Sequence, residues 1–152
     1  MDLILWRHAE AVEGAPDHGR VLTAKGRKQA TRMGQWLDAR LPTGCRILVS
    51  PAVRTVRTAE ALGRPYRIDP ALGTNGNVQA ILTAAHWPSS REPVLIVGHQ
   101  PTLGRLASYL MGGSEQDWTV RKGNIWWIST RETETSRTMS MIRIVMAPEL
   151  IG

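Results

Sequence analysis

The sequence has a single cysteine, Cys45, among its 152 residues, so no disulfide can form within the chain. Nothing therefore argues for an oxidising compartment. No apolar run approaches the roughly 20 residues that a membrane-spanning helix needs. The first apolar run follows Asp2 rather than a basic segment and stops at Arg7, which is unlike a secretory signal peptide. We therefore expect a cytoplasmic protein that does not associate with a membrane.

Signals for metal and nucleic-acid binding are also missing. None of the histidines is spaced from another histidine or from a carboxylate as a pair of metal ligands would be. The four histidines are His8, His18, His86 and His99. We therefore expect neither a metal nor another cofactor. The net charge is +6, but the basic residues are scattered, and no RNA-binding aromatic signature accompanies them. This charge favours phosphate or an acidic protein surface over nucleic acid as the partner. A genome whose composition favours arginine codons would explain the same excess of basic residues.

The residues that are present predict alternating strands and helices. With 42% hydrophobic and 21% charged residues, the chain has the composition of one globular domain, residues 1–152. Strands alternating with helices form a largely parallel sheet covered on both faces, so we expect a three-layer α/β/α sandwich. The apolar runs predict strands at 3–6, 46–50, 66–69 and 94–97, and the periodic or capped segments predict helices at 23–41, 51–62, 77–85 and 102–111.

The last part of the chain has a different pattern. Residues 124–129 and 139–146 are expected to form a C-terminal hairpin, with the polar stretch 130–138 as an exposed, mobile loop. Neighbouring residues on a strand face opposite sides of the sheet. One of Trp126 and Trp127 should therefore enter the core while the other points outward.

An Arg-His pair directly follows the first buried strand. Arg7 and His8 lie at the carboxyl end of the apolar run 3–6. Ligands bind at this edge in open α/β sheets. A guanidinium beside an imidazole suggests an anion site in which His8 is a nucleophile or a proton carrier. Taken alone, the pair is equally well explained as an ordinary surface pair in a loop.

Two further strand ends change that balance. The pair Ser50-Pro51 is a helix-start signal, with Ser50 as the N-cap, so Arg54 falls in the first helical turn after the second strand. His99 follows the strand at 94–97 in the same way. Because the carboxyl ends of parallel strands meet at one edge, we expect Arg54 and His99 to lie beside the Arg-His pair.

These four residues are suited to phosphoryl transfer. The guanidiniums of Arg7 and Arg54 can clamp phosphoryl oxygens through paired, charge-assisted hydrogen bonds. His8 can attack phosphorus and carry the phosphoryl group, which splits hydrolysis into two in-line steps. His99 can stabilise the charge on the equatorial oxygens. None of these roles needs a metal ion.

Three segments resemble motifs of the histidine phosphatase (phosphoglycerate mutase-like) superfamily. Leu-Trp-Arg-His-Ala at 5–9 resembles its Arg-His-Gly signature. Ser-Pro-Ala-Val-Arg-Thr at 50–55, followed by Thr58-Ala59, resembles Ser-Pro-x-x-Arg-x-x-x-Thr-Ala, and Val-Gly-His-Gln-Pro at 97–101 resembles the second-histidine motif. The motifs occur in the family's order and span nearly the whole chain. The resemblance implies a phosphoglycerate mutase-like fold.

Within the superfamily, the chain is similar to the SixA-type phosphohistidine phosphatases. The similarity rests on the small size, on Arg-His-Ala in place of Arg-His-Gly, and on Arg-Val-Leu-Thr-Ala-Lys-Gly at 20–26, which resembles their Arg-Pro-Leu-Thr-x-x-Gly segment. It implies that His8 is the phosphorylated nucleophile. It also implies that the phosphate pocket is formed by Arg7, Arg54 and His99. Arg20 would make a looser contact with the substrate.

One departure from the superfamily pattern bears on the substrate. Many members place a carboxylate general acid, in a Leu-x-Glu pattern, in the stretch that corresponds to residues 70–76, and this chain has no acid there. Ester leaving groups need a proton, and a general acid contributes about 10²–10⁴-fold. Phosphohistidine has a better leaving group and needs that help less. The missing acid therefore favours a phosphohistidine substrate, although Asp69 and Glu10 stay open as proton donors.

The spacing of the motifs leaves no room for a helical lid. A strand, a helix and loops occupy most of the residues between Arg54 and His99. An open pocket suits a phosphorylated side chain on a protein better than a small metabolite that must be enclosed. We therefore predict a metal-independent phosphatase acting on phosphohistidine in a protein. The alternatives are a phosphatase of small phosphomonoesters with the same mechanism, and a module that recognises phosphate without hydrolysing it.

Overall fold

A six-stranded sheet runs through the middle of the molecule. The structure, a computed structural model, describes residues 1–151. The strand order is β3-β2-β4-β1-β5-β6; the first four strands are parallel, and β5 and β6 run antiparallel to their neighbours. This sheet confirms the predicted fold class. The strands are β1 (Asp2–Arg7), β2 (Arg46–Val49), β3 (Arg67–Ile68), β4 (Val94–Gly98), β5 (Ile125–Glu132) and β6 (Thr138–Met146).

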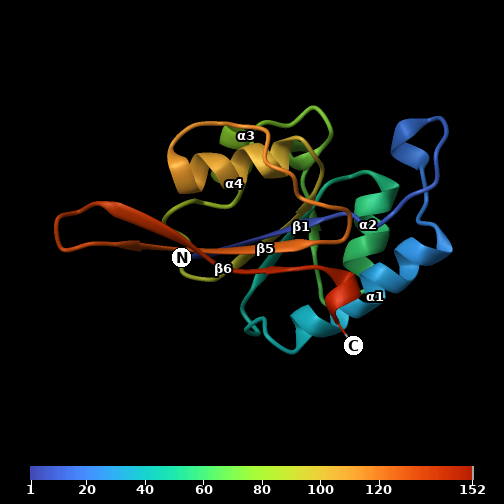
Figure 1. The fold of residues 1–152 in the computed structure, drawn as a ribbon, viewed down its shortest axis with the longest axis horizontal. Coiled ribbons are helices and arrows are strands. Elements are labelled where there is room, and N and C mark those ends of the chain that lie inside the picture. Colours follow the sequence, from blue (N-terminus) through green and yellow to red (C-terminus); the bar gives the residue numbers. More distant parts are fainter. Residues whose placement is uncertain (152) are drawn as a thin grey trace.

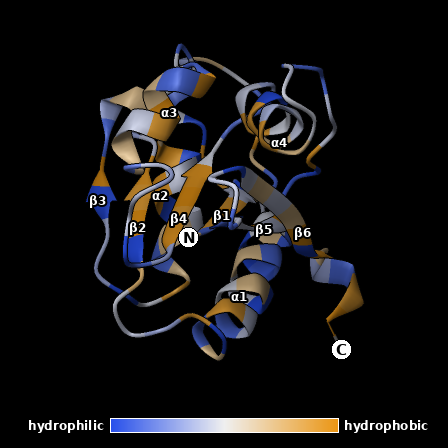
Figure 2. Ribbon diagram, turned by 90° about the vertical axis from the view of Figure 1, so that its left-hand side faces the viewer, coloured by the Kyte–Doolittle hydropathy of each residue, from blue (hydrophilic) through white to orange (hydrophobic). Residues whose placement is uncertain are grey.

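Helices cover both faces of the sheet. Helices α3 and α4 lie on one side, and α1 lies on the other (Figures 1 and 2). Within residues 1–151, no helix is both long and apolar enough to cross a lipid bilayer. The helices are α1 (Ala24–Asp38), α2 (Val53–Glu60), α3 (Val78–Ala84) and α4 (Thr102–Gly112), and the short 3-10 turns are η1 (Asp17–Gly19), η2 (Pro70–Leu72) and η3 (Pro148–Leu150).

The core divides into two layers because side chains alternate along each strand. In β1, Leu3 and Leu5 join the cluster that contains α3 and α4 side chains, whereas Ile4 and Trp6 join the cluster of α1 and α2. All four side chains are fully buried. Burying such a side chain stabilises the fold by about 1.5–3 kcal/mol relative to leaving it exposed. An unbroken apolar run is therefore what a strand covered on both faces requires.

The start of α2 differs from the prediction. The helix begins at Val53, and its N-cap is Ala52 rather than Ser50. The Ser50 hydroxyl lies instead 2.7 Å from Nε2 of His99. The prediction of Ser50 as the N-cap was wrong because the helix begins two residues later; the hydroxyl accepts from the N–H of Ala52 at 3.4 Å and also bonds a partner 49 residues away, which local sequence does not reveal.

The C-terminal hairpin is longer than predicted. Its ladder continues to the pair Glu132↔Thr138, so the predicted loop shortens to residues 133–137, most of which are exposed as expected. Main-chain hydrogen bonds hold an antiparallel pair whatever the side chains are, so the polar side chains at the two ends of this stretch did not mark the strand ends. The two tryptophans face opposite sides of the sheet as predicted, and Trp127, 7% exposed, lies in the core. Trp126 is only partly exposed, because it packs against Trp118 on the other face of β5.

Candidate active site

The register of the sheet brings His8 and His99 together. Arg7 pairs with Gly98 across the parallel strands β1 and β4, so the residues that follow emerge side by side at the carboxyl edge. The main-chain N–H of His8 donates to the carbonyl of Gly98 at 3.1 Å. The two imidazole centroids are 5.4 Å apart, and the residues are only 5% and 4% exposed. A two-strand register therefore places both histidines as the sequence predicted.

His8 is held as a neutral imidazole with a defined tautomer. Its Nδ1 lies 2.8 Å from the carbonyl oxygen of Ala9. A carbonyl oxygen only accepts hydrogen bonds, so Nδ1 carries the proton and Nε2 keeps its lone pair. Burial, helped by the nearby His99, Arg7 and Arg54 and opposed by the Ala9 hydrogen bond, lowers the pKa of His8 to about 3. At neutral pH the side chain therefore has the form that a nucleophile needs.

His99 is also neutral and has one unused nitrogen. Nε2 is held by the Ser50 hydroxyl, and Nδ1 is buried without a hydrogen-bond partner. Burial lowers the pKa of His99 to about 4; Arg54 and Arg7 also lower it, and Asp17 raises it. When the hydroxyl of Ser50 donates to Nε2, the single proton of His99 lies on Nδ1. A buried N–H without a partner is a donor available to a bound anion.

Arg54 projects from the first turn of α2 and is 4% exposed. Its Nη1 donates to the main-chain oxygen of Asp17 at 2.9 Å, and its Nη2 donates to the carboxylate of Asp17 at 3.2 Å. Arg20 reaches the same carboxylate at 3.2 Å through Nη1, while its Nε donates to the carbonyl of Val12. The structure thus links Arg20 to the site through Asp17. Nε of Arg54 is buried without a partner.

Arg7 has a different set of contacts. Its Nη1 donates to the carbonyl of Val120 at 2.9 Å, and its Nε is buried without a partner. The loop before β5 also holds the main chain of the Arg-His pair, because the N–H of Gly123 donates to the carbonyls of Arg7 and His8 at 3.2 and 3.0 Å. Gly123 has φ = +77°, a conformation that favours glycine. This loop therefore fixes Arg7 without supplying a negative charge.

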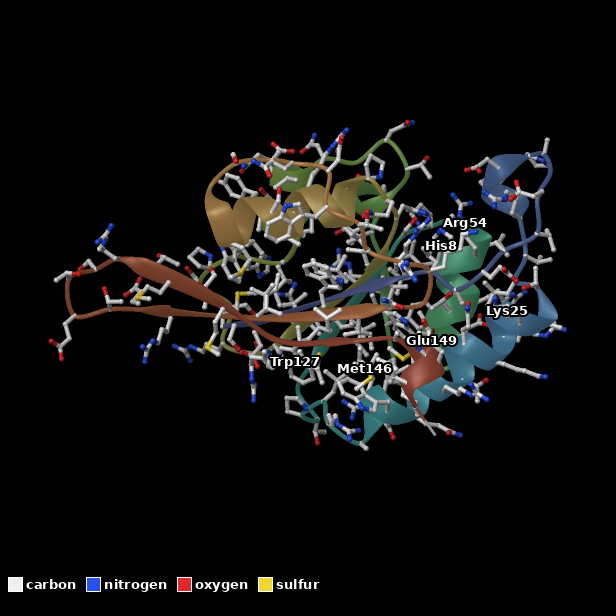
Figure 3. The ribbon with its side chains drawn as sticks, viewed as in Figure 1. His8, Lys25, Arg54, Trp127, Met146 and Glu149 are labelled. Carbon is white, nitrogen blue, oxygen red and sulfur yellow. The ribbon has the colours of Figure 1, made fainter. Side chains whose placement is uncertain are left out.

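Thr58 ties two of the motifs to each other. Its hydroxyl accepts from the N–H of Ala9 at 3.0 Å and donates to the carbonyl of Arg54 at 2.7 Å. Figure 3 shows His8 and Arg54 close together at one end of the molecule. A threonine four residues after Arg54 on α2 thus explains why the Thr-Ala element belongs to the motif that carries the arginine.

The structure also places the open candidates for a proton donor. Glu10 accepts from the Thr23 hydroxyl at 2.7 Å and borders a cavity that Arg7 also lines. Asp69 caps η2 by accepting from the N–H of Ala71, and the cavity that it lines contains none of the predicted site residues. Among residues 1–151, no three His, Cys, Asp or Glu side chains gather into a group that could hold a metal ion.

No helix covers the site within the described chain. The segment between α2 and β4 forms only β3, η2 and α3. Helix α3 buries Val78, Ile81 and Leu82 in the core on the face of the sheet. Within residues 1–151, this segment places no α-helix over the site; residues 70 and 73–75 instead line a cavity together with Asp17 and Ser50.

Sequence reasoning missed Asp17 and the loop Val120–Asn124. Asp17 lies in an irregular loop, where no periodicity or motif spacing marks a single acid as a partner of Arg54. The loop before β5 contacts Arg7 and His8 through carbonyl and N–H groups, which every residue has. Only the Gly at position 123, needed for its positive φ, offered a signal.

Comparisons with known proteins agree with this geometry. The model of the histidine phosphatase superfamily, branch 1, matches residues 3–75. The chain is 30% identical over 128 residues to the phosphohistidine phosphatase SixA homolog of Haemophilus influenzae, covering 74% of this chain and 78% of that protein. It is 31% identical over 123 residues to phosphohistidine phosphatase SixA of Escherichia coli, covering 74% and 76%, respectively.

A solved structure has the same fold. The protein histidine phosphatase SixA complexed with tungstate matches with a TM-score of 0.77 at 23% identity, over 100% of both chains. The likeness extends to the C-terminal hairpin, which lies outside the residues matched by the family model.

Proposed function

The chain belongs to the histidine phosphatase superfamily (branch 1), and on that premise we propose that it removes phosphate from phosphohistidine in a protein through a phosphorylated His8. The observation that carries the proposal is the neutral His8, whose Nε2 is unprotonated and unbonded beside His99 and two arginines. Relatives named as phosphohistidine phosphatases support the substrate class. Residues 1–152 act as one catalytic domain.

The first step transfers the phosphoryl group to the enzyme. Nε2 of His8 attacks phosphorus in line and forms the new N–P bond, while the N–P bond to the substrate breaks and its electron pair returns to the substrate ring. A substrate ring that is protonated on its other nitrogen then leaves as neutral imidazole. Arg7 and Arg54 hold the equatorial oxygens, and the free Nδ1–H of His99 stabilises their charge. These groups supply the positive charge, so the reaction needs no metal ion. The proton stays on Nδ1 of His8 throughout the attack, and Nδ1–H continues to donate to the Ala9 carbonyl.

The second step returns the enzyme to its starting state. A water molecule attacks the phosphorus on His8, the N–P bond breaks, and inorganic phosphate leaves. The electron pair of the broken N–P bond returns to Nε2, which stays unprotonated at neutral pH because the pKa of His8 is about 3, and the protons of the attacking water leave with the phosphate or pass to solvent. The same two arginines and His99 stabilise this transition state, since the charge again develops on the phosphoryl oxygens.

The state of the nearby acids supports a leaving group that needs little protonation. The hydrogen bond from Arg20 holds the pKa of Asp17 below its ordinary value against a small opposing effect of burial, and Arg54 lowers it further. Asp17 is thus ionised and a poor proton donor at neutral pH. Glu10 is engaged by Thr23. A substrate imidazole leaves without strong acid assistance, whereas a sugar alkoxide does not.

The test of the mechanism is to trap phosphate on His8. After brief exposure to a phosphotransfer domain labelled on its histidine, the enzyme should carry acid-labile phosphate, located on His8 by mass spectrometry. His8→Ala should abolish both the label and turnover. His18→Ala is the matched control, because that histidine is exposed in the η1 turn and has no hydrogen bond in the described chain. Wild-type turnover by His8→Ala would refute the nucleophile.

A second measurement separates the substrate classes. We expect kcat/KM to be higher for the labelled phosphotransfer domain than for a panel of phosphomonoesters. A clear preference for esters would assign the protein to the small-molecule alternative. Tight phosphate binding without turnover of any substrate would assign it to the recognition module.

A further inference from the structure

A cationic cavity adjoins the site on the side of Arg7. Its volume is about 410 Å³, and its charged lining residues are Arg7, Glu10, Lys25, Arg121, Lys122 and Glu149. Lys25 lies in the first turn of α1, and Glu149 lies in η3. Figure 3 shows Lys25 and Glu149 at the same end of the molecule as His8. Segments distant in the sequence thus place charged side chains next to the phosphate-binding arginine.

The basic residues of this cavity are attached firmly to the nucleophile. Arg121 and Lys122 directly precede Gly123, whose N–H donates to the carbonyls of Arg7 and His8. The carbonyl of Arg121 also accepts from the N–H of Asn124, which closes the turn. Any group that binds these cations is therefore held at a fixed position relative to His8.

The positive charge of the cavity is not balanced within residues 1–151. Lys25, Arg121 and Lys122 have no ion-pair partner there, and four cations face two carboxylates. Glu10 is already engaged by the Thr23 hydroxyl. By contrast, carboxylates pair with six other arginines: Arg20, Arg54, Arg57, Arg64, Arg105 and Arg143. The cavity is thus a local excess of unpaired cations beside the site.

We infer that this cavity binds acidic side chains that flank the phosphohistidine on the protein substrate. The inference rests on the proposed function and names a feature of its substrate. Lys25, Arg121 and Lys122 are exposed and lie on two segments distant in the sequence, so they suit several carboxylates on a surface better than one compact phosphate. No aromatic side chain lines the cavity, so it lacks the stacking platform typical of single-stranded nucleic acid sites.

The test reverses the charge of two lining residues. In Arg121→Glu/Lys122→Glu, we expect kcat/KM for a phosphotransfer domain with acidic flanking residues to fall about tenfold at low salt. The fall should be much smaller for phosphoimidazole, which has the same N–P bond without a protein surface. In about 0.5 M salt, the difference between variant and wild type should shrink, because exposed charges are screened.

The matched control is Arg131→Glu/Arg137→Glu. Both residues are exposed on the hairpin, which projects from the end of the molecule opposite α1 and α2 (Figure 1). Neither has an ion pair within residues 1–151. The two double variants change the net charge equally. An equal fall of kcat/KM in the two double variants would show that only net charge matters and would overturn the inference. If Arg121→Glu/Lys122→Glu lowered kcat/KM equally for the phosphotransfer domain and for phosphoimidazole, that result would also overturn it.

Failure of the proposed function has a different signature. Wild-type protein would then hydrolyse neither the phosphotransfer domain nor phosphoimidazole. In that case, binding of the same domain to wild type and variant, measured by calorimetry, decides the inference: weaker binding by the variant supports it, and equal binding refutes it. Loss of poly-uridine binding by the variant, with unchanged binding of the domain, would assign the cavity to nucleic acid and also refute it.

Discussion

The two arginines proposed to hold the phosphoryl group differ in what balances their charge. Arg54 donates to the carboxylate and to the main-chain oxygen of Asp17. Arg7 donates to the carbonyl of Val120 and has no carboxylate within ion-pair distance in residues 1–151. One guanidinium is therefore neutralised before a substrate arrives, and the other is not.

The neighbouring histidines reflect this difference. Asp17 raises the pKa of His99 and so opposes part of the effect of Arg54. No acid opposes the effect of Arg7 on His8, where only the hydrogen bond to Ala9 raises the pKa. The difference suggests two roles: Arg7 attracts the incoming anion, and Arg54 exchanges the Asp17 carboxylate for a phosphoryl oxygen.

Removing either arginine should have the largest effect. We expect Arg7→Met and Arg54→Met each to lower kcat/KM by about 10²–10³, the usual cost of losing one donor to a developing oxyanion. Arg54→Met also leaves the Asp17 carboxylate near the phosphate with Arg20 as its one remaining ion-pair partner among residues 1–151. Adding Asp17→Asn should therefore restore part of the activity of Arg54→Met and none of that of Arg7→Met. Equal rescue of both variants would contradict the proposed asymmetry.

Neutralising Asp17 alone should have a moderate effect of the opposite sign. Asp17→Asn removes a competitor for Arg54, so inorganic phosphate should inhibit about two- to fivefold more strongly, in line with the energy of an exposed ion pair. The inhibition constant measured against the phosphotransfer domain checks this expectation. Asp38→Asn is the control, because it breaks an ion pair with Arg64 on the surface. Weaker inhibition of Asp17→Asn would show that Asp17 orients Arg54 instead of competing for it.

The smallest expected effects are shifts in histidine titration. Both folded-state pKa values, about 3 for His8 and about 4 for His99, lie below the ordinary 6.5. The unfolded chain therefore binds more protons, and the stability contribution is complete above pH 6.5 and is lost as the pH falls toward those values. NMR titration should show Arg7→Met raising the pKa of His8 and Asp17→Asn lowering that of His99. Unchanged titration of both histidines would refute the electrostatic comparison.

Much of this site was predictable because its key residues end buried strands. The apolar run 3–6 was confirmed as the core of β1, and the Arg-His pair and His99 emerge side by side through the register of β1 and β4. Parallel strands share a direction, so residues after each strand meet at one edge. Arg54 followed from its place in the first turn after β2, although the helix boundary was wrong by two residues.

The failures share a cause. Ser50 was assigned to a cap because local sequence favours one, but its hydroxyl bonds His99 across the sheet. The ladder between Glu132 and Thr138 was missed because main-chain hydrogen bonds do not depend on apolar side chains. Asp17 was missed because it reaches Arg54 across 37 residues of sequence. None of the three has a periodic signal, and the contacts of Ser50 and Asp17 span 49 and 37 residues of sequence.

The sequence by itself determined the order of strands and helices, the apolar faces of β1, and which residues stand at the carboxyl edge, because side-chain periodicity and strand ends are local properties. Only the tertiary structure decided how charge is balanced there: Asp17 on Arg54, a carbonyl on Arg7, and unpaired cations in the adjoining cavity. Coulomb interactions depend on distance in space, and folding sets that distance between residues far apart in the chain.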